Sequence, residues 1–104
     1  MLFVLAALSA VGARAQTFDV PPELWDRPRT ARAVLDQENV RRAVAAALAK
    51  PEARIVIHHG PGQEPLVQAE ELRSWLAALA IDSRRTVLRA DAAPGASITL
   101  EITP

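Results

Sequence analysis

The residues best suited to chemistry in this sequence are two adjacent histidines, His58 and His59. They end a short β-branched run, Arg54 to His58, which predicts a buried central strand, and open α/β sheets bind ligands at the carboxyl ends of their strands. Imidazole serves as an acid, a base or a metal ligand near neutral pH. Neighbouring side chains on a strand point to opposite faces, so the pair does not readily bind one metal ion, even with Glu64 and Asp91 as helpers. We expect a hydrogen-bonded strand end, with a small metal-dependent enzyme as an alternative.

The loop after the histidines is the second candidate for chemistry. Gly60, Pro61 and Gly62 precede a predicted helix, and backbone N–H groups at a helix N-terminus attract anions. The spacing matches neither the dinucleotide-binding motif nor the P-loop, and the prolines remove donors, so a plain turn is expected. The sequence has no cysteine, and no serine lies in a nucleophile motif. We therefore expect no catalytic residue, no metal and no cofactor; the candidate ligand-binding residues are His58, His59, Gly60, Gly62, Glu64 and Arg73.

The N-terminus has the pattern of a secretion signal. The apolar run from Leu2 to Val11 has the length of a signal-peptide core and is shorter than the ~20 residues of a membrane-spanning helix. An A-x-A pattern ending at Ala15 predicts that residues 1–16 are removed by cleavage near Ala15/Gln16. No Lys or Arg separates Met1 from the run, so whether Met1 is the true start stays open. We expect a periplasmic or secreted protein without a transmembrane segment after processing.

The composition narrows the class of protein further. The chain carries twelve Lys and Arg and twelve Asp and Glu, so the part after Arg14 has eleven basic against twelve acidic residues. This balance gives no electrostatic attraction to nucleic acid. The processed chain is one small domain that buries only about 60–65% of its unfolded surface, which leaves little room for an enclosed active site. With two Trp, two Phe and no Tyr, its core must consist mainly of Leu, Val, Ile and Ala.

Residues 17–30 hold three prolines and no sustained period, which predicts an extended arm. Three of its apolar side chains, Phe18, Leu24 and Trp25, are unsuited to a freely solvated tail. We expect the arm to pack on its own domain, and the alternative is that these three residues bind a protein partner.

Two helices and three strands are predicted in residues 31–104, a single domain. Asp36 is the expected N-cap of the first helix, which ends before Pro51, and Pro65 is the expected first residue of the second. Residues 31–35 are compatible with a strand or a helix start. The predicted buried stripes are Val40, Ala43, Val44, Ala47 and Leu48 in the first helix, and Leu66, Ala69, Leu72, Leu76, Leu79 and Ala80 in the second.

The strands are predicted at residues 54–58, 86–89 and 97–102, and the last alternates cleanly between apolar and polar positions. Pro94 and Gly95 suit the two central positions of a type II turn, so the last two strands are expected to form an antiparallel hairpin. The predicted fold is α+β, a small two-layer sandwich with a βαβαββ-like order. Two helices cover one face of a three- to four-stranded mixed sheet, preceded by the extended arm.

Residues 38–89 resemble the peptidoglycan-binding domain shared by outer-membrane protein A and its relatives. The resemblance lies in the order of helix, buried strand, Gly-containing loop, helix ending W-L-x-x-L-x-I, and strand. In that family a loop Asp and a helix Arg grip the diaminopimelate of the peptide stem. Here the loop HHGPGQEP contains no Asp, and the Arg-Ala position falls on Gln68 and Ala69. The resemblance implies peptidoglycan binding only if Glu64 replaces the acid and Arg73 the base.

These observations favour an exported, non-catalytic accessory or binding protein of the cell envelope, with an envelope protein as its partner. A peptidoglycan-binding domain with a degenerate grip is the first alternative. The second is a small metal-dependent enzyme that uses His58 or His59.

Overall fold

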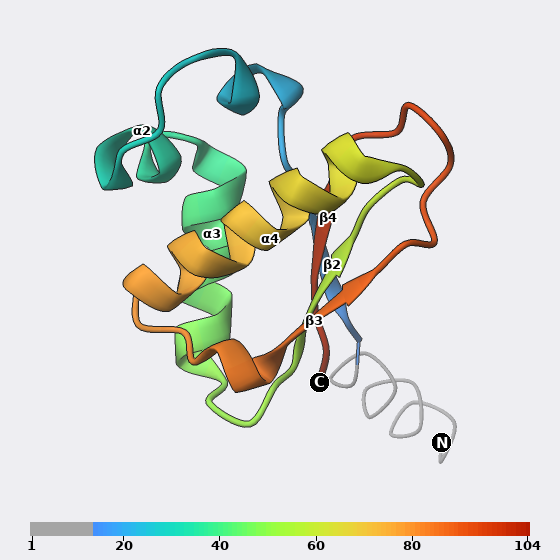
Figure 1. Ribbon diagram of the computed structural model, residues 1–104. Coiled ribbons are helices and arrows are strands. Elements are labelled where there is room, and N and C mark those ends of the chain that lie inside the picture. The colour runs from blue at the N-terminus through green and yellow to red at the C-terminus, as the bar shows by residue number, and fades with distance from the viewer. Residues whose placement is uncertain (1–13) are drawn as a thin grey trace, which may run out of the picture.

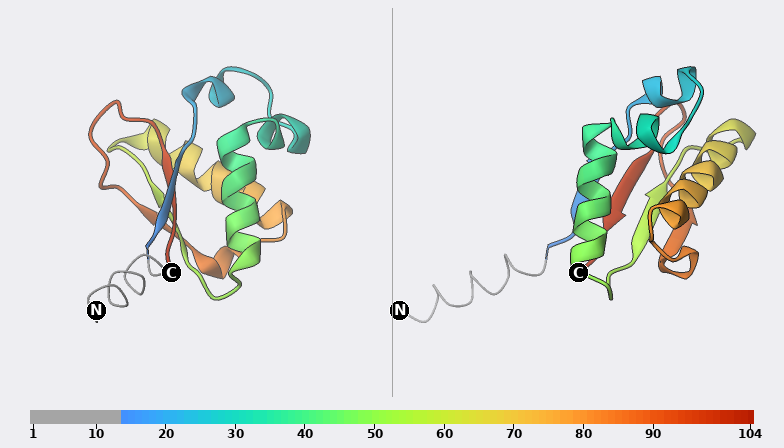
Figure 2. Two further views of the ribbon diagram at one scale, coloured as in Figure 1. Left: turned by 180° about the vertical axis from the view of Figure 1, so that it is seen from behind. Right: turned by 90° about the vertical axis from the view of Figure 1, so that its left-hand side faces the viewer.

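Residues 14–104, which the computed structural model describes, form a four-stranded mixed sheet with helices on one face (Figures 1 and 2). The strands are β1 (Gln16–Asp19), β2 (Ile55–His58), β3 (Thr86–Arg89) and β4 (Thr99–Ile102), in the order β1-β4-β2-β3. β2 and β3 are parallel, whereas β4 is antiparallel to both β1 and β2. The predicted α+β class and the central position of β2 are confirmed. The predicted signal peptide lies mostly outside the described residues.

Helices α3 (Glu38–Ala49) and α4 (Gln63–Ala78) form the second layer. α3 packs over β1 and β4, and α4 packs over β2 and β3 (Figure 2). Most strand positions that face the helices are apolar, with Gln16 and Thr86 as polar exceptions. The opposite sheet face carries polar side chains such as His58, Thr99 and Glu101. The buried core consists of Val20, Leu24, Val34, Val40, Ala43, Val44, Ala47, Ala53, Ile55, Ile57, Ala69, Leu72, Leu76, Ile81, Ile98, Leu100 and Ile102.

The predicted hairpin between the last two strands is wrong. The turn itself forms, because Ala96 N donates to Ala93 O at 3.0 Å and Gly95 has a φ of 79°. The chain then passes the carboxyl end of β2, where Ala92 N donates to His59 O, and β4 inserts between β2 and β1. The physical reason is burial: in the middle of the sheet Leu100 and Ile102 are only 0% and 2% exposed. An edge position would have left one side of these two residues open to solvent.

The prediction that residues 17–30 form an extended arm without regular structure is also wrong. The first residues of this arm form β1 together with Gln16 of the predicted signal peptide. β1 is an edge strand antiparallel to β4, so the sheet begins at Gln16 and not within residues 31–104. A 3-10 helix, η1 (Pro22–Asp26), follows, with Leu24 fully buried. Three prolines had argued against regular structure, but Pro22 lies in the first turn of η1, where its missing N–H costs no hydrogen bond.

Residues 31–35 form a short helix, α2 (Ala31–Leu35), which resolves the alternative that the sequence left open. Thr30 caps it, since its hydroxyl accepts from Ala33 N at 3.0 Å. Asp36 is the C-cap of α2 and not the predicted N-cap of the next helix, because α3 starts only at Glu38.

The buried stripes are confirmed except at their ends. Leu48 is 49% exposed and Leu66 is 40% exposed, and each lies in a terminal turn of its helix. Ala80 is exposed as well, with a φ of 77°, and ends the turn after α4. α4 itself begins at Gln63, two residues before Pro65.

Arg85, in the 3-10 turn η2 (Ser83–Arg85) before β3, closes the carboxyl end of α3. Its guanidinium donates to the carbonyls of Ala47, Lys50 and Ala53 at 2.9, 2.7 and 3.0 Å. Ala47 O and Lys50 O also accept from the backbone N–H groups of Lys50 and Ala53, so Arg85 adds a second, charged donor to each of them. No helix of the described chain is long and apolar enough to cross a membrane.

Candidate functional site

The side chains of the two adjacent histidines lie in different environments and do not meet. His59 is 3% exposed, and its Nδ1 lies 2.9 Å from the carbonyl of Gly60. Its backbone N–H donates to Arg89 O and its carbonyl accepts from Ala92 N. His59 therefore packs the strand end against the loop after β3, as expected for a hydrogen-bonded strand end.

His58 points the other way, onto the open face of the sheet, and lies between two carboxylates. Its Nδ1 is 2.7 Å from Asp91 Oδ1, and its Nε2 is 2.7 Å from Glu101 Oε1. Both ring nitrogens face acceptors, so only the doubly protonated imidazolium can donate to both at once. We call the three side chains the His58 clasp. It ties β2 to β4 and to the start of the loop that joins β3 to β4.

The clasp is reflected in the pKa values of its members. Partial burial of the ring opposes its charge, but the hydrogen bonds to Glu101 and Asp91, with the charges of both, outweigh burial and raise the pKa of His58. The hydrogen bond from His58 lowers the pKa of Asp91. Arg89, next to His58 in the parallel register, lowers it slightly further. The pKa shifts of His58 and Asp91 thus both favour their charged forms near neutral pH.

The clasp is poorly suited to catalysis or to metal binding. A general base needs a ring nitrogen that can accept a proton, and both nitrogens of His58 are occupied by carboxylates. Thr99, which pairs with His58 across the sheet, does not offer its hydroxyl to the imidazole, because that hydroxyl donates to Asp19 at 3.3 Å. Within residues 14–104, no group of three or more His, Cys, Asp or Glu side chains is arranged to hold a metal ion.

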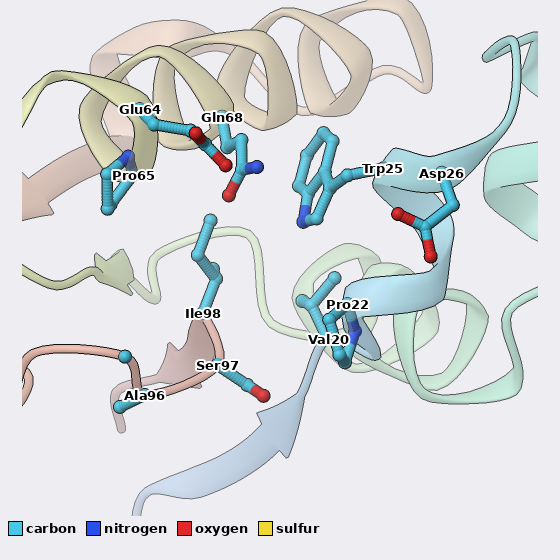
Figure 3. A pocket seen from close by; sticks show the side chains of 11 residues that line it. Val20, Pro22, Trp25, Asp26, Glu64, Pro65, Gln68, Ala96, Ser97 and Ile98 are labelled. Atoms are coloured by element: carbon cyan, nitrogen blue, oxygen red, sulfur yellow. The ribbon is translucent and has the colours of Figure 1, made fainter.

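A pocket of about 360 Å³ lies at the end of the sheet where β1 and β2 finish (Figure 3). We call it the arm pocket, because the arm forms one wall, the first turns of α4 the second, and the loop before β4 the third. Ligands of α/β sheets commonly bind at this end. Its lining residues are Val20, Pro22, Trp25, Asp26, Glu64, Pro65, Gln68, Gly95, Ala96, Ser97 and Ile98.

Polar and apolar groups converge in the arm pocket. Val20 and Ile98 are buried and form its apolar base, while Trp25 is half-buried. In Figure 3 the side chains of Glu64 and Gln68 project from α4 toward the indole of Trp25. A few polar groups set around an apolar base are typical of small-molecule sites.

An ion pair fixes the arm wall to α4. Arg29 donates to both carboxylate oxygens of Glu71, at 2.8 and 3.0 Å, and its guanidinium lies 5.5 Å from the centre of the Trp25 ring. Trp75 Nε1 donates to the same carboxylate at 3.0 Å. The hydrogen bond from Arg29 is the main reason that the pKa of Glu71 is lowered. A bidentate pair with a stacked cation holds Trp25 in place at the pocket.

The remaining predicted site residues have mixed positions. Gly60 is buried where a Cβ would lie 3.2 Å from Ala93 O, and Gly62, with a φ of 101°, precedes α4, so both serve the turn. Leu24 lies in the core and cannot meet a partner, whereas Phe18 is half-buried and packs under Arg42 of α3, 5.8 Å from ring centre to guanidinium. Of the predicted partner-binding residues, Trp25 alone lines the arm pocket.

The predicted replacements for the peptidoglycan grip are not brought together. Glu64 lines the arm pocket, but Arg73 does not, and it follows nine residues later on the same helix. Nine helical residues are about 13.5 Å and two and a half turns, which places the two side chains on opposite sides of α4. No protein-family model, curated protein or solved structure matches this chain.

Several residues of the two sites were not singled out from the sequence. Asp26, Gln68 and Glu101 had no local motif, and Arg29 and Glu71 are 42 residues apart. A local signal existed only for the pair of Glu71 and Trp75, since side chains at i and i+4 are neighbours on a helix.

Proposed function

We propose that this protein is exported to the periplasm or secreted, and acts as a non-catalytic binding or accessory protein of the cell envelope. The single observation that carries the proposal is the arm pocket, with a half-buried tryptophan and convergent polar side chains at the strand ends. Trp is a residue type that dominates binding energy at many sites. Its position at a pocket, instead of in the core, supports a binding role for the arm.

The start of the fold supports the export part of the proposal. β1 begins at Gln16, at the predicted cleavage position near Ala15/Gln16. Removal of residues 1–16 would therefore take only the first pair of the β1 to β4 ladder, Gln16 with Ile102, and would leave the pairs of Thr17 to Asp19 intact.

The non-catalytic part rests on the His58 clasp. Both ring nitrogens bind carboxylates, which leaves the imidazolium without a free position for a substrate proton. The structure gives no support to an enzyme built on His58 and His59, because one ring is on the open face and the other is buried.

Sedimentation with the insoluble envelope fraction tests the proposal, with purified peptidoglycan assayed in parallel. We compare the wild-type protein with Trp25→Ala and Gln68→Ala, which alter the arm pocket, after checking the fold of each by circular dichroism. Val67→Ala is the matched control, since Val67 neighbours Gln68 on α4 but is 50% exposed outside the pocket. Retention that is lost in both pocket variants and kept in the control is the expected result.

Two results would overturn the assignment of the site. Retention that is unaffected by either pocket variant would move binding away from the arm pocket. Retention by peptidoglycan that Arg73→Ala weakens, while Trp25→Ala does not, would instead establish the family-like alternative.

A further inference from the structure

The charged side chains of the arm pocket are all acidic. Asp26 and Glu64 line it, and no Lys or Arg does. Within residues 14–104, neither carboxylate forms an ion pair, whereas Glu71, Asp82, Asp91 and Glu101 are each paired with a basic group. The pocket therefore presents negative charge that the fold itself does not compensate.

The uncharged groups of the pocket suit a cation equally well. Trp25 offers an aromatic ring, which attracts ammonium groups through its faces; the guanidinium of Arg29 lies 5.5 Å from the ring centre, so a ligand ammonium would need the other face. Gln68, between Glu64 and Trp25 in Figure 3, offers an amide oxygen that accepts a hydrogen bond. Val20 and Ile98 supply an apolar surface for the carbon frame that carries the charge.

An anion is disfavoured despite the helix end nearby. The N-terminus of α4 carries the positive end of the helix dipole, which elsewhere attracts phosphate or carboxylate. Here Glu64 is the second residue of α4 and already places a carboxylate there, and Pro65 removes one of the free N–H groups.

We propose that the arm pocket binds a protonated primary amine on a small apolar or sugar frame. This inference rests on the proposed function, because it assigns the ligand chemistry of the same pocket. The volume of about 360 Å³ accommodates a group of the size of an amino sugar or an alkylamine. The two sources of such an amine, a sugar and an alkyl chain, share this chemistry and are separated by the probes.

Titration of the purified protein with matched probes tests the inference. Glucosamine and glucose differ by the ammonium group alone, cadaverine supplies the amine without the sugar, and glutarate is the anionic comparator. Binding is followed by the NMR signals of the backbone and of the two indole N–H groups, which report Trp25 and Trp75 separately. We expect glucosamine or cadaverine to shift the Trp25 indole and the amides of the first turn of α4, with glucose and glutarate inactive.

A charge-neutralising variant gives the quantitative test. Glu64→Gln keeps the size of the side chain and should weaken amine binding about fivefold, the ratio expected for one partly exposed ion pair. Glu70→Gln makes the same change on the same helix outside the pocket, and should change affinity less than about twofold. Amine binding should also weaken with rising salt, because exposed charges are screened.

The failure of this inference is distinguishable from that of the proposed function. Glucose binding as tightly as glucosamine, a preference for glutarate, or equal effects of Glu64→Gln and Glu70→Gln would each overturn the amine assignment while the arm pocket remains the site. If no probe shifts the Trp25 indole and sedimentation does not require Trp25, both proposals fail.

Discussion

Replacing His58 with Gln should destabilise the fold at mildly acidic pH and much less at alkaline pH. In the folded protein the imidazolium donates to Asp91 and Glu101, at 2.7 Å each. Glutamine keeps a polar side chain of similar length but carries no charge and cannot donate to both carboxylates from opposite sides. The two carboxylates then face each other across the open sheet face without a cation between them.

The size of the effect follows from the exposure of the groups. Hydrogen bonds to charged groups contribute about 1.5–3 kcal/mol, and exposed ion pairs about 0.2–1 kcal/mol. The side chains of His58 and Glu101 are 24% and 30% exposed, which places the loss on replacing His58 between these limits, at about 1–2 kcal/mol. For a domain of this size, about 1 kcal/mol corresponds to a shift in Tm of about 4–8 °C.

The sign of the pH dependence is fixed by the pKa of His58, which is raised in the folded state. The stabilisation is fully present below the unfolded pKa of about 6.5 and is lost as pH rises through the folded pKa. The lowered pKa of Asp91 sets the acid limit, since its contribution is lost as pH falls below the usual carboxylate range. The clasp should therefore be strongest between about pH 4.5 and 6.5.

Urea unfolding of wild type, His58→Gln, Glu101→Gln and the double variant forms a cycle that isolates the pairwise coupling. We expect a favourable coupling at about pH 6 that shrinks by about pH 8.5. Glu52→Gln, a change at an exposed loop residue without a charge partner in the described chain, is the control. A coupling that is absent at both pH values, or that grows with pH, would refute this interpretation of the clasp.

Three further changes test the fold. Leu24→Ala should cost about 2–5 kcal/mol in urea unfolding, because the side chain is fully buried; a change below about 0.5 kcal/mol would return the arm to a peripheral role. Arg85→Ala should cost about 1–3 kcal/mol, since three carbonyls at and just after the end of α3 lose a charged donor, while Arg84→Ala, which removes only a surface ion pair with Asp82, should change Tm much less. Gly60→Ala should lower Tm, because its Cβ would lie 3.2 Å from Ala93 O; an unchanged Tm would show that the loop shifts freely.

The elements with a strong local period were predictable, and those that depend on distant pairing were not. The stripes of α3 and α4 and the β-branched run of β2 follow from hydrophobic spacing within one element. β1 has four residues, with no alternating pattern, and is a strand only because Phe18 and its neighbours pair with β4 about 80 residues later. Tertiary pairing overrides local propensity in such a short segment.

The prediction of the strand order failed for a related reason. A turn at Pro94 and Gly95 predicts a local reversal correctly, but it does not say which strand the chain meets next. With β1 unrecognised, the sheet had no partner for the second edge of β4, and a hairpin with β3 was the simplest arrangement. The gain from burying Leu100 and Ile102 on both sides decides the observed order.

The candidate site was predictable only in its anchors. His58 was expected at a strand end from its position after a buried run, and Trp25 was noted as too apolar for a free tail. The partners of His58 are 33 and 43 residues away, and the walls of the arm pocket come from three separate segments. These segments come together only because of the strand order, which cannot be predicted from sequence spacing alone.

Site-specific photo-crosslinking at the arm pocket tests the proposed function most directly. The sequence has no cysteine, so Ser97→Cys places a single attachment point for a photo-reactive group at the rim of the pocket. Ser74→Cys, on α4 away from the pocket, is the matched control. We predict that the probe at position 97 crosslinks to one envelope component, competed by unlabelled wild-type protein, and that the probe at position 74 does not. Equal crosslinking at both positions, or none at position 97, would contradict the assignment of the arm pocket as the binding site.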